Sequence, residues 1–305
     1  RAAPAARASR NHDTRRGGQE SQTRGQSSEL ERGSSCIDNP LRRRGYLPPM
    51  PHRNLSFEAV VLRCRESPGG DRIVTFLAAD SGLVEAFVFG GPKSRLRSLA
   101  APYHAGTAWI YLDPVKDLRK LSDFDARETY PSLRENLRKI WAASYFAETV
   151  LRTDAAGGES REAFDLLRSG LSALDAGGEA DVDYVCLQYG WRILGLMGLR
   201  PDPEICGQCG TPFQEGRGAA YSRIQETFRC DRCARAGDSG NSMDDLTLSG
   251  GALRYLAASE ALPFRDALRV RPSGEDVPIL KALVFHLVRS AAEGELRTLA
   301  RGELL

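Results

Sequence analysis

The residues most suited to chemistry are four cysteines arranged in two Cys-x-x-Cys pairs. Cys206 and Cys209 form the first pair, Cys230 and Cys233 the second, and 20 residues separate the pairs. Two residues between thiolates let both sulfurs reach one metal ion, and two such pairs supply a tetrahedral zinc site. Because four thiolates leave no open coordination position, the spacing predicts one structural Zn²⁺ ion. Free or redox-active thiols and an iron–sulfur centre are the alternatives.

The other reactive residues do not form a catalytic pattern. The chain contains neither Gly-x-Ser-x-Gly nor His-Glu-x-x-His, and it lacks the Lys-x-Asp-Gly of ligases. The segment around Lys93 superficially resembles a phosphate-binding loop, but Pro92 stands where that loop requires glycine. The four histidines are scattered: His12, His52, His104 and His286. We therefore predict a binding protein and not an enzyme.

Nine basic residues are candidate contacts to single- and double-stranded DNA. They form three clusters near expected loops: Arg63, Arg65 and Arg72; Lys93, Arg95 and Arg97; and Lys116, Arg119 and Lys120. In nucleic-acid-binding barrels such cations hold phosphates, while aromatic rings stack on bases. Phe87, Phe89, Tyr103 and Tyr111 are available for stacking. The alternative is a set of ordinary solvated loops, because the net charge of the chain is +2.

These three clusters fall in a region, residues 54–130, that is expected to be β structure. Short β-branched and aromatic runs separated by glycine-rich turns predict strands. They occupy residues 57–62, 73–79, 83–89 and 108–112, with a fifth strand within 120–129. Five short strands over about 75 residues fit a small closed barrel of the OB type. A small sandwich is the competing interpretation.

Beyond residue 130 the apolar pattern becomes helical. Ser132 and Glu135 have the spacing of a capping box, which predicts a helix over 132–152 with Leu133 and Leu137 facing inward. Further helices are expected between the Gly-Gly pairs at 157–158 and 177–178, at 181–199, at 249–259 and from 276 onward. The cysteine pairs lie in an insert at 201–241, with short strands expected at 219–221 and 227–228.

The predicted fold class is therefore α+β. A five-stranded OB-type barrel (residues 50–130) precedes an α-helical domain (131–305) with a four-Cys zinc finger. Residues 1–49 carry ten arginines but four of Leu, Ile, Val and Phe combined. We expect a disordered basic extension that is not native, with Met50 as the true start. A basic arm or a transit-like segment is the alternative. Because no apolar run approaches the ~18 residues of a membrane span and no secretory signal is visible, we expect a cytoplasmic protein without membrane contact.

The order of these parts resembles the bacterial recombination mediator family RecO over about residues 54–295. The resemblance is carried by FEAVVLR at 57–63, DRIVTFL at 71–77, DSGL at 80–83 and GGPKSRL at 90–96, followed by a helical domain with four cysteines. Lys93 and Arg95 match the basic loop of the family, and the four cysteines match its metal positions. In the family an acidic residue usually follows the basic stretch of the first strand. Here that residue is replaced or shifted, since Glu66 precedes the turn at 67–70.

Membership would imply a DNA-repair role without nucleotide hydrolysis. It implies binding of single- and double-stranded DNA and annealing of complementary strands. It also implies that the protein, together with RecR, helps to load RecA onto DNA coated by single-strand-binding protein, near the nucleoid. A generic OB and zinc module without mediator activity, or a ligase- or nuclease-like fragment, are the alternatives.

Overall fold

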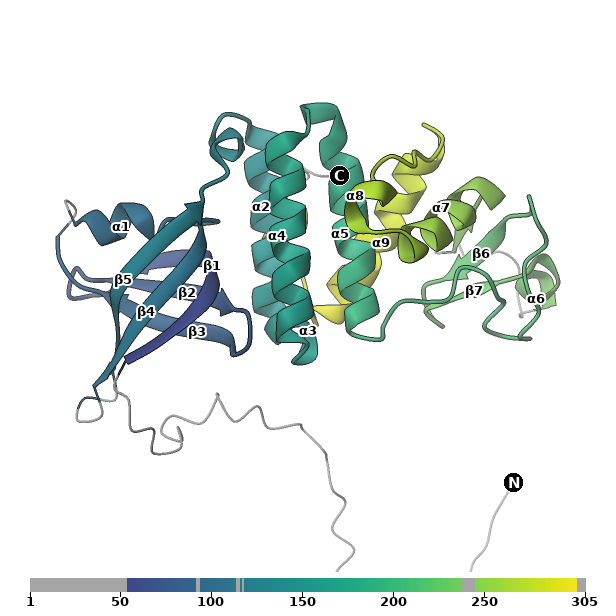
Figure 1. Ribbon diagram of the computed structural model, residues 1–305. Helices are drawn as coiled ribbons and strands as arrows, with labels where there is room; N and C mark the ends of the chain where they lie inside the picture. The colour runs from purple at the N-terminus through teal and green to yellow at the C-terminus, as the bar shows by residue number, and fades with distance from the viewer. Residues whose placement is uncertain (1–53, 92–93, 114–115, 117, 237–244, 301–305) are drawn as a thin grey trace, which may run out of the picture. The chain divides into compact units, whose positions relative to one another are not determined.

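The structure, a computed structural model, describes residues 54–91, 94–113, 116, 118–236 and 245–300. Residues 1–49, and with them the expected extension, lie outside the described residues. Five strands form a closed barrel in the order β1-β2-β3-β5-β4, which confirms the predicted barrel and excludes the sandwich (Figure 1). The strands are β1 (Asn54–Glu66), β2 (Arg72–Ala78), β3 (Gly82–Val88), β4 (Ala105–Asp113) and β5 (Leu118–Glu128).

The hairpin of β2 and β3 follows from the Asp-Ser-Gly turn. Gly82 has a φ of 66°, a left-handed conformation that glycine adopts without steric cost. The register pairs Ala78 with Gly82, and alternate residues beyond the turn point inward. Inside the barrel, the rings of Phe76 and Phe124 lie 5.8 Å apart between their centroids. The predicted hairpin is confirmed.

Strand β1 is buried on both faces in its central part. Ala59 and Val61 point into the barrel, whereas Val60 and Leu62 belong to the core of the helical domain. A strand covered on both sides has an apolar run instead of an alternating pattern, which explains the continuous Ala-Val-Val-Leu sequence. The barrel and the helices therefore share apolar packing through β1, and Leu77 of β2 and Ala105 of β4 belong to the same core.

The helical domain is built on α2, α4 and α5, which run side by side in Figure 1. Aromatic rings fill its centre: Phe146 and Tyr189 stack with centroids 3.9 Å apart, and Tyr145 meets Phe285 edge-on at 5.5 Å. Within the described part of the chain, no helix is long and apolar enough to cross a bilayer. The main helices are α2 (Leu137–Arg152), α4 (Ser160–Ala176), α5 (Val182–Leu196), α7 (Gly250–Ala261) and α9 (Asp276–Ala291).

The predicted start of the first long helix is wrong. Residues Pro131–Arg134 form a 3₁₀ turn, and α2 begins at Leu137 with Asn136 as its cap, whose side chain accepts a hydrogen bond from the Lys139 N–H at 3.1 Å. Ser132 does not cap this helix, because its N–H and hydroxyl instead donate to Asp175 at 2.9 and 2.8 Å. Leu137, expected to face inward, is 66% exposed.

Shorter elements complete the chain. Residues expected to form an exposed basic loop instead include a one-turn helix, α1 (Arg95–Leu99). The cysteine insert contains the predicted hairpin of β6 (Ala219–Ser222) and β7 (Thr227–Arg229). An unpredicted third strand, β8 (Leu246–Leu248), pairs with β6. The remaining short helices are α3 (Asp154–Gly157), α6 (Asp231–Ala236), α8 (Phe264–Ala267) and α10 (Arg297–Ala300).

Candidate metal centre and nucleic-acid interface

The four cysteines of the two pairs come together in space. The Sγ atoms of Cys206, Cys209, Cys230 and Cys233 all lie within 4.8 Å of one another, and those of Cys209 and Cys230 are 3.9 Å apart. Four sulfurs at the ~2.3 Å zinc–sulfur distance of a tetrahedral site are about 3.8 Å apart, so the cluster has the size that zinc requires. Among the described residues, this is the single group of three or more Cys, His, Asp or Glu side chains able to share a metal ion.

Two glycines place the first cysteine pair. Gly210 has a φ of 69°, and its N–H donates to the carbonyl of Cys206 at 2.8 Å. Gly207 lies so close to β7 that an added Cβ would be 1.9 Å from the Thr227 hydroxyl oxygen. The second pair comes from the end of β7 and the start of α6, since Cys233 lies in the first turn of that helix. The hairpin thus holds both pairs against each other.

Local hydrogen bonds favour the thiolate form at Cys206 and Cys209, whereas hydrogen bonding with Cys209, together with burial, raises the pKa of Cys233. Hydrogen bonding with the side chain and backbone of Thr211, and then with Cys206, lowers the pKa of the Cys209 thiol to about 5. Burial acts to raise the pKa of Cys206, but the backbone N–H groups of Cys230, Cys209 and Gln208 outweigh it, and the pKa is lowered. Cys64 lies outside the cluster, and burial raises its pKa to about 11, as expected for an inert thiol.

Two of the predicted cations are held on the outer face of the barrel by one carboxylate. Arg65 Nη2 lies 2.9 Å from Glu85 Oε2, and Arg63 Nη2 lies 3.5 Å from Glu85 Oε1. Both arginine side chains are 51% exposed. Glu85 is a residue that sequence reasoning missed, although its alternate position on β3 places it on the solvent side. The two arginines are accessible and fixed in place.

A second carboxylate gathers the next two cations around the β1–β2 turn. Arg72 donates to Glu66 at 3.2 Å and to the carbonyl of Arg97 at 3.1 Å. Arg97 itself is 6% exposed and donates to the carbonyl of Gly70 at 2.5 Å. Glu66, the acidic residue whose position differs from the RecO pattern, therefore holds this turn against α1. Arg97 has little surface left for a ligand, and we leave it out of the proposed DNA contacts.

The remaining predicted cations lie at two places on the barrel. Arg95 is exposed on α1, and Lys93 next to it lies outside the described residues. Lys116 and Lys120 are exposed in and after the β4–β5 connection, while Arg119 is half-buried. Lys120 Nζ lies 5.8 Å from the ring centroid of Phe89, an exposed aromatic residue after β3.

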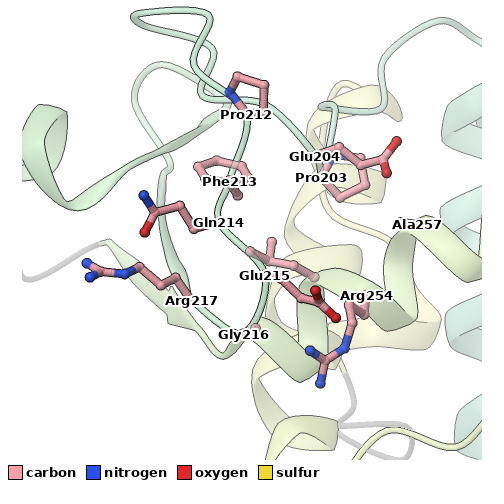
Figure 2. A pocket seen from close by; sticks show the side chains of 12 residues that line it. Pro203, Glu204, Pro212, Phe213, Gln214, Glu215, Gly216, Arg217, Arg254 and Ala257 are labelled. Carbon is pink, nitrogen blue, oxygen red and sulfur yellow. The ribbon is translucent and has the colours of Figure 1, made fainter.

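A small cavity lies between the cysteine insert and the helical domain. The chain around Phe213 forms one wall, and Arg254 and Ala257 of α7 form the other, as Figure 2 shows. Its volume of about 220 Å³ is below the roughly 300–1,000 Å³ typical of small-molecule sites. Residues of both charge signs line it, including Glu204 and Arg217. We assign it no role in the proposed function.

Comparison with known protein families shows to which family the chain belongs. Residues 50–130 match the family model described as Recombination protein O N terminal, and residues 134–300 match the one described as Recombination protein O C terminal. The chain belongs to the Recombination protein O (RecO) family. RecO proteins are DNA repair and recombination proteins, and the barrel and the four-cysteine helical domain are the parts of this chain that the two models cover.

Individual relatives carry the same family name. A protein of Pelotomaculum thermopropionicum named DNA repair protein RecO is 32% identical over 50% of this chain and 58% of its own length. RecO proteins of Symbiobacterium thermophilum and a Roseiflexus species are 30% and 29% identical. Those matches cover 72% and 76% of this chain and 84% and 80% of the relatives. The predicted RecO membership is confirmed.

Proposed function

We propose that the protein is a recombination mediator that acts by binding DNA. In this role it binds single- and double-stranded DNA, anneals complementary strands and, together with RecR, helps to load RecA onto DNA coated by single-strand-binding protein. The observation that carries the proposal is the match of both parts of the chain to RecO. The protein works in the cytoplasm at the nucleoid, without covalent catalysis.

The mechanism rests on the exposed cations of the barrel. Arg63 and Arg65 are held by Glu85, and Arg95, Lys116 and Lys120 are exposed on the same barrel. Such cations hold phosphates and release counterions, so the backbones of two strands repel each other less while they pair. Since phosphate contacts carry no sequence information, the protein can act on strands of any sequence.

The zinc ion has a structural role in this proposal. Cys206, Cys209, Cys230 and Cys233 would hold it through four thiolates, which fits the size of the cluster. The ion supplies the cross-link that keeps the β6–β7 hairpin and α6 folded. It offers no open position to a substrate.

DNA binding by the full chain tests the proposal. Lys93→Ala combined with Arg95→Ala should weaken binding and reduce the salt dependence of the binding constant. The slope of the logarithm of the binding constant against the logarithm of the salt concentration should become less steep by about 0.7 per lost phosphate contact on a single strand. The matched control is Arg265→Ala with Arg269→Ala, two exposed arginines of the helical domain. An unchanged slope in the barrel variant would place the binding surface elsewhere.

The mediator role requires a separate assay. RecA assembly on single strands coated with single-strand-binding protein should start sooner when the full chain and RecR are added together than with either alone. A chain that binds DNA but leaves this delay unchanged would be a generic binding module, and the mediator proposal would fail.

A further inference from the structure

The four cysteines of the cluster differ in their access to solvent. Cys206 and Cys233 are 0% and 7% exposed, and the backbone N–H of Cys230 donates to Cys206 Sγ at 3.4 Å. Cys230 is half-buried, whereas Cys209 is exposed. Reactive cysteines in proteins are partly exposed and stand beside positive charge, whereas buried ones are inert. Cys209 is therefore the cysteine of this cluster that a reagent in solution reaches most easily.

Polar groups and an open cavity adjoin the exposed cysteine. The Thr211 hydroxyl oxygen lies 3.3 Å from Cys209 Sγ. Arg232 of α6 is exposed, and hydrogen bonding with Cys209 raises the pKa of its guanidinium, which stays charged. Thr211 and Arg232 also border an open cavity of about 300 Å³, which reaches Cys230. A small polar molecule in this cavity is therefore close to a cation and to the two more accessible cysteines.

The sulfurs of these two cysteines lie close to each other. Cys209 Sγ and Cys230 Sγ are 3.9 Å apart, whereas a disulfide bond requires about 2.05 Å. Gly210, next to Cys209, has a φ of 69°, and an added Cβ there would meet nothing within 4 Å. Because a glycine with open space around it lets the backbone shift, this turn can close the remaining gap.

We propose that Cys209 and Cys230 form a peroxide-sensitive pair, which converts to a disulfide and releases the zinc ion of the cluster. The inference rests on the four-thiolate site of the proposed function. The Cys209 thiolate attacks one oxygen of a hydroperoxide, so that an S–O bond forms, the O–O bond breaks and hydroxide leaves. The Cys230 thiolate then attacks the sulfur of the Cys209 sulfenic acid, so that an S–S bond forms and a second hydroxide leaves.

The reaction is a balanced two-electron oxidation. Two thiolates lose two electrons to become one disulfide, and hydrogen peroxide is reduced to two water molecules with two protons from the solvent. The site loses two of its four ligands, so the ion dissociates. The β6–β7 hairpin then loses its cross-link, and β6 pairs with β8, which leads into α7. Oxidation therefore loosens the insert, and a thiol reductant restores it.

Peroxide treatment of the full chain tests the inference. The zinc content of the untreated chain is measured first, because a folded chain without zinc would refute the metal centre itself. Hydrogen peroxide in molar excess should then release about one zinc ion per chain to a chromogenic chelator. Mass spectrometry should find a disulfide between Cys209 and Cys230. Cys64 and Cys186, whose pKa values are raised by burial, should stay reduced. Dithiothreitol with added zinc should restore the original zinc content.

Two matched variants locate the reactive pair. Cys230→His and Cys233→His each leave three thiolates and an imidazole, a ligand set that still binds zinc. Cys230→His should lose most of the peroxide-induced zinc release, because the second sulfur of the pair is gone, whereas Cys233→His should retain it. The disulfide mapping in the wild type decides the matter even where a variant binds zinc poorly.

Three results would overturn the inference while the zinc site and the DNA-binding proposal stand. The first is zinc that remains bound to the wild type under peroxide. The second is a set of disulfides that form only within each Cys-x-x-Cys pair. The third is equal zinc release from Cys230→His and Cys233→His when both variants start with bound zinc.

Discussion

The guanidinium of Arg97 donates a hydrogen bond to the carbonyl oxygen of Gly70 at 2.5 Å. Arg97 lies on α1 and Gly70 in the turn between β1 and β2, so this bond fastens the helix to the turn. Glu66 accepts a second bond from the same guanidinium at 3.4 Å. The arrangement makes Arg97 a part of the barrel's framework, in contrast to its exposed neighbour Arg95.

We predict that Arg97→Ala destabilises the fold by about 1.5–3 kcal/mol, because it removes charged hydrogen bonds from a buried site. Arg95→Ala is the matched control two residues earlier, and it should change the free energy of unfolding by less than about 0.5 kcal/mol. Urea unfolding of both variants measures the difference. Equal stability of the two variants would contradict the structural role of Arg97.

Metal analysis of the purified chain should find about one zinc ion per molecule. Cys230→Ser should reduce the zinc content to near zero and lower the thermal unfolding temperature, because the four-thiolate cross-link is lost. Cys64→Ser is the control, since Cys64 lies outside the cluster and donates to the carbonyl of Ala100 at 3.3 Å. A folded preparation without metal, or zinc that persists in Cys230→Ser, would refute the metal centre.

The ion pair between Glu128 of β5 and Arg168 of α4 should make stability depend on acid pH. Hydrogen bonding from Arg168 lowers the pKa of Glu128 below its usual value. A carboxyl with a depressed pKa contributes stability above its unfolded pKa of about 4.3, and this is lost as pH falls through the folded value. Because the pair is about one-third exposed, we expect Glu128→Gln to cost about 1 kcal/mol at pH 7.

Unfolding at pH 7 and pH 3 measures this dependence. The difference between wild type and Glu128→Gln should shrink at pH 3, where the native carboxyl is becoming protonated. Glu162→Gln, on the exposed side of α4, is the control and should show no such dependence. A difference that is constant across pH would show that the cost of the substitution does not depend on the charge of Glu128.

Gly190 on α5 should not tolerate a larger residue. An added Cβ would lie 2.6 Å from both Tyr145 Oη and Val284 Cγ1, which belong to the tightly packed core. We expect Gly190→Ala to destabilise the fold by about 1–3 kcal/mol. Gly195→Ala on the same helix is the control, because its nearest neighbour is the flexible end of Arg200, at 2.8 Å. Similar unfolding midpoints for the two variants would contradict the close packing at Gly190.

Local patterns predicted the features that depend on neighbours in the chain. Glycine-rich turns and short apolar runs gave the barrel strands, and the spacing of Cys206 to Cys233 gave the metal cluster. Strand β8 has three residues and becomes a strand through pairing with β6, which no local signal indicates. The capping box predicted at Ser132 does not form for a similar reason. Ser132 instead donates a hydrogen bond to Asp175, which is distant in the sequence.

The candidate DNA-binding site shows the same limit. Arg95 and Arg97 look equivalent in a basic segment, but residues two apart on a helix point to different sides. Only the packing of α1 against the β1–β2 turn decides which one is buried. Likewise, the strand registers decide that Arg65, Phe87 and Lys120 share one row. Residue type predicted the kind of contact, whereas the fold determines which residues are available for it.

The most direct test of the mediator proposal is the annealing of complementary strands, each coated beforehand with the cognate single-strand-binding protein. The full chain is added without ATP, and duplex formation is followed over time. The account predicts faster annealing than in the absence of the protein, and a smaller acceleration with Lys93→Ala and Arg95→Ala. Annealing that is no faster with the wild-type protein than without it would contradict the central claim.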